Sequence, residues 1–260
     1  MELAWIIFLF LVGIIFIVKG GDFFVDAASC IAEVSGIPKL IIGATIVSLA
    51  TTLPELLVSV MAAARKNVDM AIGNAVGSVT ANIGLIMAIS LICMPAVIKR
   101  ADYLMKSILM LAAAALIVAC GFLGETGIGI SAVLIVIFLV FLWENVISAR
   151  RSMRQGQEGE KRRLKTGKKE IGINIAKFVV GAVGIVWGAD LLVDTGSALA
   201  AMAGIPERVI GVTIIAVGTS LPELITTITA IVKKQSSLSV GNILGANIID
   251  LSLILPLRAL

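Results

Sequence analysis

Histidine is absent from the 260-residue sequence, and cysteine occurs only three times. The absence of histidine excludes Ser-His catalytic dyads, His-Glu-x-x-His zinc sites and histidine-ligated haem. Cys30, Cys93 and Cys120 lie in apolar segments, and none belongs to a Cys-x-x-Cys pair. They are therefore interpreted as small buried residues rather than as ligands of a metal or cofactor. These absences argue against an enzyme.

Charged residues are also few, at 15% of the chain, whereas hydrophobic residues make up 59% and the mean hydropathy is +1.08. A soluble domain is nearer half apolar. Uncharged runs recur, for example at residues 3–18, 107–124 and 128–143. They reach the roughly 20 residues of a membrane-spanning helix when neighbouring Gly, Ser and Thr are included. The first run lacks a basic region and an Ala-x-Ala site, which favours a spanning helix over a signal peptide.

Charges, prolines and glycines divide the chain into eight predicted spans, so we expect an all-α polytopic membrane protein. The spans cover residues 3–33, 39–64, 70–97, 104–123, 127–148, 171–203, 207–232 and 237–257.

One strongly basic loop lies between the fifth and sixth spans, at residues 149–170, with nine Lys or Arg residues against three Glu. Short basic loops stay in the cytoplasm. This rule places the loop inside and the N-terminus outside, in a multi-pass protein of the cell membrane. Lys106 and the pair Lys233 and Lys234 agree with this orientation, whereas Arg65 and Lys66 do not. Because the positive charge is concentrated in this loop, we expect a lipid partner and no nucleic acid.

The chain contains an internal duplication. A shift of 168 residues aligns 20–82 with 188–250 without a gap, with 23 identities in 63 positions. The matches fall on Gly, Pro, Asp, Asn and Glu rather than on apolar residues alone, which indicates a true repeat. Five spans separate equivalent positions, and an odd number predicts an inverted repeat, as in many transporters. We expect a first repeat of five helices at 1–148 and a second repeat at 171–260 with three helices present.

The motif Leu-Pro-Glu occurs within a predicted span of each copy, at Pro54-Glu55 and Pro222-Glu223. Proline removes a backbone hydrogen bond and clashes with the preceding turn, so both helices should break there and free carbonyl groups, including that of Thr51. A charge near the bilayer centre costs about 2.5–3.5 kcal/mol. Two glutamates at equivalent positions therefore indicate a functional site.

Further oxygen-bearing side chains accompany these breaks. Hydroxyl groups cluster on the same turns in both copies, and each Gly-Asn-x-x-Gly motif is followed by Asn82 or Asp250. The glycines are explained by close helix packing, whereas Asn74 and Asn242 are not. Oxygen ligands suit hard cations such as Ca2+ and disfavour zinc and copper. The hydroxyl residues at the breaks are Thr51, Thr52, Thr219 and Ser220.

Other acids carry less weight. Asp22, Asp26, Asp190 and Asp194 should lie near helix ends, where capping, ion pairing or an ion entry path are all open. Glu144 is interpreted as an ordinary interfacial charge.

The doubled motifs resemble a known family. Residues 43–55 and 211–223, which end in Leu-Pro-Glu, and residues 73–82 and 241–250, which begin with Gly-Asn, look like the alpha-repeats of sodium/calcium exchangers. The family is the calcium/cation antiporter superfamily, and its prokaryotic sodium/calcium exchangers are the most similar. The resemblance covers nearly the whole chain. It implies a ten-helix inverted-repeat fold and alternating access.

The resemblance also implies a set of ligands for transported ions, with no cofactor. Ca2+ would be held by Glu55, Glu223 and the carbonyls of Thr51 and Thr219. Asn82 and Asp250 would complete the centre. The Na+ sites would involve Thr52, Ser220, Ser78 and the carbonyls of Ser48 and Ala216.

The sequence departs from the family pattern at three points. Ala246 stands where the family has a hydroxyl residue, Ala50 stands where the family usually has Gly, and the chain stops at Leu260, two helices before the family pattern ends. The second repeat is therefore expected to be truncated. Beside Na+/Ca2+ exchange, Ca2+/H+ exchange and a cation channel remain open as alternatives. An intramembrane hydrolase is disfavoured, because histidine and a Gly-x-Gly-Asp pair are both missing.

Overall fold

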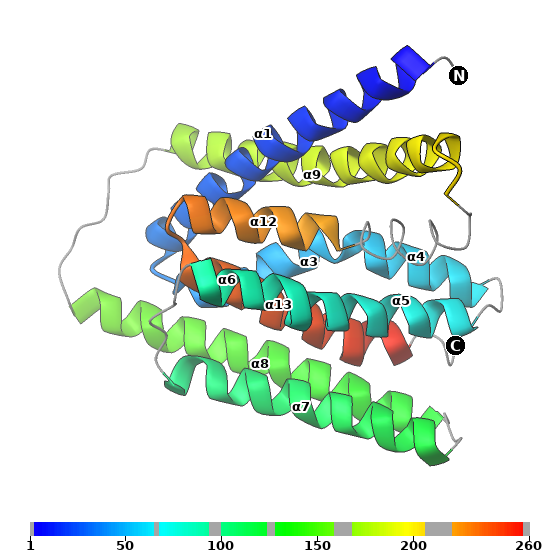
Figure 1. The fold of residues 1–260 in the computed structure, drawn as a ribbon. Coiled ribbons are helices and arrows are strands. Elements are labelled where there is room, and N and C mark those ends of the chain that lie inside the picture. Colours follow the sequence, from blue (N-terminus) through cyan, green and yellow to red (C-terminus); the bar gives the residue numbers. More distant parts are fainter. Residues whose placement is uncertain are drawn as a thin grey trace.

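The computed structural model describes residues 3–64, 68–93, 100–123, 128–158, 168–205 and 220–256, and every regular element in these ranges is helical. Figure 1 shows α1 and α9 along one side of the molecule and α7 and α8 along the other, with the remaining helices between them. The elements are α1 (Leu3–Ser35), α2 (Lys39–Ile42), the π-helix η1 (Gly43–Val47), α3 (Ser48–Thr51), α4 (Leu53–Ala64), α5 (Val68–Ala81), the π-helix η2 (Asn82–Met87), α6 (Ala88–Cys93), α7 (Arg100–Leu123), α8 (Ile128–Glu158), α9 (Lys168–Met202), α12 (Leu221–Val232), α13 (Ser236–Ile249) and the π-helix η4 (Asp250–Ile254).

Six stretches of helix are long and apolar enough to cross a membrane, and two shorter apolar helices accompany them among the described residues. The expected all-helical polytopic fold is therefore confirmed. The helix α8 continues to Glu158 and α9 begins at Lys168, so the basic segment expected at 149–170 is helical at both ends. Of the seventh predicted span, 207–232, the structure describes only the part from Ser220 onward. Arg65 and Lys66 also lie outside the described residues.

The helical elements repeat at the same interval of 168 residues as the sequence. The bounds of α4 and α5, shifted by that interval, give those of α12 and α13, and the π-helices η2 and η4 begin at the equivalent residues Asn82 and Asp250. Gly36 and Gly204 follow the long helices α1 and α9 with positive φ values of 70° and 79°. This left-handed conformation is readily available only to glycine. The duplication therefore extends from residue identity to local backbone structure.

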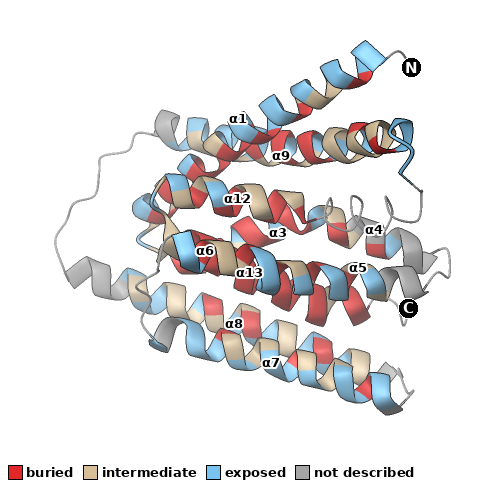
Figure 2. Cartoon of the chain, in the orientation of Figure 1, coloured by how far each residue is buried: buried red, intermediate tan, exposed pale blue. Residues whose placement is uncertain are grey.

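The helix α13 forms the centre of the molecule. Every residue from Leu238 to Ile249 is buried, as Figure 2 shows by its almost continuous red colour. Glycines allow this close packing: a Cβ on Gly43 would collide with the carbonyl oxygen of Leu238, and a Cβ on Gly241 would collide with that of Leu40. The backbones of α2 and η1 therefore lie directly against α13, which confirms the packing role expected for glycine at positions 241 and 245. For the equivalent Gly73 and Gly77 the expectation is wrong, because a Cβ there would meet no atom of the described structure within 4 Å.

The helices α1 and α9 lie against each other along most of their length. A Cβ on Gly20 would lie 2.9 Å from the carbonyl oxygen of Gly181, and the rings of Phe24 and Phe178 are 4.5 Å apart. Only 22% of the apolar window of each helix is buried. Their outer faces therefore remain apolar and exposed, as expected for surfaces that contact lipid.

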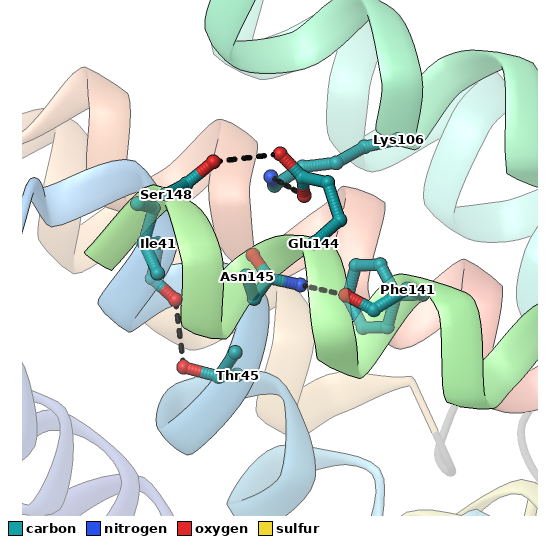
Figure 3. Close-up of polar contacts among 7 residues, drawn as sticks. All are labelled: Ile41, Thr45, Lys106, Phe141, Glu144, Asn145 and Ser148. Atoms are coloured by element: carbon teal, nitrogen blue, oxygen red, sulfur yellow. Dashed lines mark hydrogen bonds and ion pairs between the residues drawn. The ribbon is translucent and has the colours of Figure 1, made fainter. Parts of the chain in front are cut away.

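A buried ion pair joins α7 to α8. Lys106 is completely buried, and its Nζ donates to Oε2 of Glu144, whose other carboxylate oxygen accepts a hydrogen bond from Ser148 at 2.8 Å (Figure 3). The Glu144 side chain is only 18% exposed. The interpretation of Glu144 as an ordinary interfacial charge is therefore wrong, because its carboxylate balances a lysine that has no contact with solvent.

We predict that Lys106→Met lowers the stability of the folded protein by about 3 kcal/mol, because the change leaves the Glu144 carboxylate without its cation in a largely buried position. Thermal unfolding in detergent micelles measures the loss. The double variant Lys106→Met/Glu144→Gln should recover much of it, since both charges are then removed. Glu33→Gln is the control, because its pair with Lys39 lies at the surface, with the Glu33 side chain 53% exposed, and the change should alter stability little. A melting curve of Lys106→Met that matches the wild type would contradict the prediction.

Candidate cation site at the helix breaks

The first Leu-Pro-Glu motif interrupts its helix where the sequence predicts, and the second lies at the start of a helix at the equivalent position. Thr52 separates α3 from α4 with φ −85° and ψ 1°, and the equivalent Ser220 precedes α12 with φ −89° and ψ 7°. These values lie in the sparsely populated bridge region, where active-site residues are often found. Each break places a glutamate, Glu55 or Glu223, in the first turn of the next helix. The helix dipole stabilises negative charge at that position.

Three carboxylates are buried together in the interior. Glu55, Glu223 and Asp250 each have a relative exposure of 0%, and the charge of Glu55 is repelled by those of both other residues. Among the described residues, neither oxygen of Glu55 or Asp250 has a hydrogen-bond partner, and one oxygen of Glu223 has none. Burial of unpaired carboxylates is strongly unfavourable. The arrangement therefore favours a positively charged ligand among these oxygens.

Neutral oxygens surround the carboxylates. The hydroxyl of Thr52 donates to Oε1 of Glu223 at 3.2 Å, and the hydroxyl of Ser220 donates to that of Ser78 at 3.3 Å. Asn82 is completely buried, and both polar atoms of its side chain are without a partner. Within the described part of the chain, no three acidic, histidine or cysteine side chains converge as a compact metal cluster would require. Neutral oxygens would therefore have to share the coordination of any bound cation.

The first copy contributes two more of the predicted residues, at the end of the short helix α3. Thr51 donates from its hydroxyl to Oδ1 of Asn242 at 3.2 Å and lies 3.3 Å from the carbonyl oxygen of Ser48. That carbonyl also accepts the backbone N–H of Thr52 at 2.9 Å, so it is already engaged within the helix. Thr219 and Ala216, which the sequence also predicts, lie outside the described residues.

The π-helices mark the other half of the site. Asn82 begins η2 and Asp250 begins η4, so each of the two equivalent polar residues stands where the α-helix widens. Single turns of π-helix are frequent at functional sites. Asn242 belongs to the same polar interior, although the sequence supplied only an unexplained asparagine in the Gly-Asn-x-x-Gly motif.

The acids given less weight lie elsewhere. Asp22 and Asp26 on α1 both pair with Lys233, at 3.2 and 2.8 Å, and their side chains are 43% and 60% exposed. Asp190 and Asp194 on α9 are exposed. Ion pairing therefore accounts for the first two, and all four are separate from the buried carboxylates.

Long apolar helices around a buried, cation-attracting centre define a multi-pass membrane transporter rather than an enzyme. A family model described as "Sodium/calcium exchanger protein" matches residues 5–146 and 173–260. The chain therefore belongs to the sodium/calcium exchanger protein family, and it is a cation exchanger. The resemblance inferred from the repeated motifs is confirmed.

Individual relatives agree with this assignment. The chain is 36% identical over 258 residues to inner membrane protein YrbG of Escherichia coli (strain K12), which covers 97% of this chain and 78% of that protein. It is 32% identical over 292 residues to sodium/calcium exchanger MaX1 of Methanosarcina acetivorans, covering 96% and 81%. A structure of the sodium-calcium exchanger NCX_Mj, soaked with 2.5 mM Na+ and 10 mM Sr2+, matches with a TM-score of 0.85 and 27% identity, covering 99% of this chain and 83% of the other.

We predict that Asp250→Asn raises the melting temperature in cation-free buffer by a few degrees, because it removes one of three mutually repelling buried charges. Thermal unfolding in micelles after treatment with a chelator measures the change. Asp22→Asn is the control. Its carboxylate is partly exposed and paired with Lys233, so the melting temperature should stay the same or fall slightly. A lower melting temperature for Asp250→Asn would show that its carboxylate is stabilised by the protein alone.

Proposed function

We propose that the protein exchanges Ca2+ for Na+ across the membrane by alternating access, with the ions bound at the helix breaks. The observation that carries the proposal is the group of three completely buried carboxylates, Glu55, Glu223 and Asp250, most of whose oxygens have no partner in the described structure. Such a group is stable when a divalent cation balances it. The names of the exchangers MaX1 and NCX_Mj support Na+ and Ca2+ as the pair of ions.

The ligands divide by charge. Ca2+, which prefers 6–8 oxygens at roughly 2.3–2.6 Å, would be bound by Glu55 and Glu223 together with the backbone carbonyls of Thr51 and Thr219. Asn82 and Asp250 would complete the coordination sphere. The less demanding Na+ would use neutral oxygens, from the hydroxyls of Thr52, Ser220 and Ser78 and the carbonyls of Ser48 and Ala216. Ala246 supplies no oxygen where the family has a hydroxyl, so this set holds one neutral ligand fewer.

Exchange requires that the site opens to each side in turn. An inverted repeat provides this directly, because two halves of opposite orientation have equivalent conformations that face opposite sides. We assign residues 1–148 to the first repeat and 171–260 to the second, connected by the basic loop 149–170. The shared bounds of α4 with α12 and of α5 with α13 support this division.

Proton exchange is the competing function, and one observation favours it. Three like charges packed together can lose their repulsion by binding protons as well as by binding Ca2+. The hydroxyl groups beside the carboxylates favour Na+ instead. Thr52 donates a hydrogen bond to Glu223, and Ser220 donates one to Ser78. Such neutral oxygens suit Na+, whereas a protonated carboxylate does not need them.

Transport measurements separate the two functions. We predict that purified protein in vesicles loaded with Na+ takes up radioactive calcium on dilution into Na+-free buffer. Glu55→Gln and Glu223→Gln should each abolish uptake, because a neutral amide no longer balances the divalent charge. Glu33→Gln, a change at an exposed pair with Lys39, is the control and should leave uptake intact. Calcium uptake that depends on a pH gradient and does not depend on a Na+ gradient would establish proton exchange instead. Uptake that survives in both glutamine variants would place the site elsewhere.

The orientation in the cell membrane is a separate prediction. With the basic loop in the cytoplasm, the N-terminus lies outside. A cysteine-free variant carrying Gln157→Cys, near the end of α8, should react with a membrane-impermeant maleimide only after the cells are opened. A cysteine at Glu2 should react in intact cells. Labelling in the reverse pattern would invert the proposed topology.

A further inference from the structure

Two equivalent asparagines make different contacts in the two copies. Asn74 on α5 donates from its amide to the backbone carbonyl of Glu55 at 3.2 Å and to the hydroxyl of Ser59 at 3.0 Å. It thereby ties α5 to the first turns of α4, directly at the residue that carries a site carboxylate. Neither bond involves the carboxylate itself, so Asn74 controls where the helix lies rather than contacting an ion.

The shift of 168 residues places Asn242 on α13 at the position equivalent to Asn74, and Glu223 and Thr227 on α12 at the positions equivalent to Glu55 and Ser59. The same tie could therefore form in the second copy, because Thr227 also carries a hydroxyl. It is not made. Asn242 instead accepts a hydrogen bond from the hydroxyl of Thr51, at 3.2 Å, on the helix that ends at the opposite break.

The groups that would form the missing tie are left without partners. The Nδ2 of Asn242 and the hydroxyl of Thr227 are both buried and make no hydrogen bond with any described residue, and each residue has a relative exposure of 0%. Buried donors and acceptors are nearly always satisfied, so each exception needs an explanation. In the first copy the equivalent pair, Asn74 and Ser59, forms a hydrogen bond. The unsatisfied groups of Asn242 and Thr227 therefore indicate that Asn242 has two alternative sets of contacts.

We propose that Asn242 is a positioning residue with two alternative binding places. In the state seen here it is held by Thr51, and in the other state its amide moves to the carbonyl of Glu223 and the hydroxyl of Thr227. The inference rests on the proposed exchange function, since it concerns the change of state during transport. Because one asparagine serves both helix breaks, closing the tie on α12 releases Thr51 on α3. The two breaks therefore change conformation together rather than independently.

Thr51→Val weakens the first of the two places, and Thr227→Val weakens the second. Thr227→Val removes a hydroxyl that has no partner in this state, so folding and Ca2+ affinity at equilibrium should match the wild type. The maximal rate of exchange should fall roughly fivefold, as expected for the loss of one hydrogen bond from the other state, while the KM for Ca2+ changes little. Thr227→Ser should restore the rate. The control Thr80→Val lies on an exposed part of α5, where its hydroxyl bonds only to the carbonyl of Val76, and should exchange normally.

The double variant Thr51→Val/Thr227→Val is the decisive measurement. Each single change disfavours one state, so the pair should restore the balance and exchange at least about threefold faster than Thr227→Val alone. A purely structural role would make the double variant equal to the slower single variant or worse, and that result would overturn the proposal. So would a Thr227→Val protein that is unfolded, or one that exchanges at the wild-type rate.

The same vesicles keep the two levels of the proposal distinguishable. If the wild-type protein shows no Na+-dependent calcium uptake, the proposed exchange function is overturned, and the proposed role of Asn242 with it. The other outcome is that the wild-type protein exchanges, Glu223→Gln abolishes exchange, and the threonine variants show no compensation. This result would overturn the proposed role of Asn242 alone.

Discussion

The structure depends on one electrostatic constraint, which is that three carboxylates lie in the interior and form no ion pair with any basic side chain of the described ranges. Glu55, Glu223 and Asp250 have no contact with solvent, and most of their oxygens have no partner within the described residues. Two lysines of the described residues pair elsewhere, Lys106 with Glu144 and Lys233 with two acids of α1. A carboxylate paired with a lysine or arginine of the protein would attract a mobile cation only weakly. At the proposed site, the deficit of positive charge is thus what would make a bound ion favourable and also removable.

Much of the fold could be predicted from the sequence, because the signals are local. Apolar length fixes the helices, and proline with the following glutamate fixes the breaks at Thr52 and Ser220. The 168-residue repeat predicts that equivalent helices begin and end at equivalent residues, and the structure bears this out for α5 and α13. The carboxylate-bearing residues could be found for the same reason, since a charge within a span stands out against apolar neighbours.

The remaining contacts could not be predicted, because they depend on which helices meet. Thr51 and Asn242 are 191 positions apart, and nothing near either residue indicates the other. The repeat does not carry over to these contacts either, because Asn242 is bound to Thr51 whereas the equivalent Asn74 is bound to Glu55 and Ser59 within its own copy. Lys106 was similarly hidden: seen in the sequence it marks the cytoplasmic end of a span, and only the packing of α7 on α8 buries it against Glu144. Duplication therefore predicts elements well and side-chain partners poorly.

The burial of α13 has a consequence for how the protein is made. Its span has a mean hydropathy of 1.4, the lowest of the six, yet 89% of it is buried, whereas α1 has 2.6 and 22%. Insertion into the bilayer during synthesis selects segments by their hydrophobicity. The polar residues Asn242, Asn247 and Asp250 make insertion of the span Ser236–Ile254 less favourable. We expect α13 to be retained in the membrane because its glycines Gly241 and Gly245 pack against the backbone of α2 and η1, which is already there. The most buried of the six spans is thus the one that depends most on its neighbours for entry, and in chain order the first repeat is in place before the second.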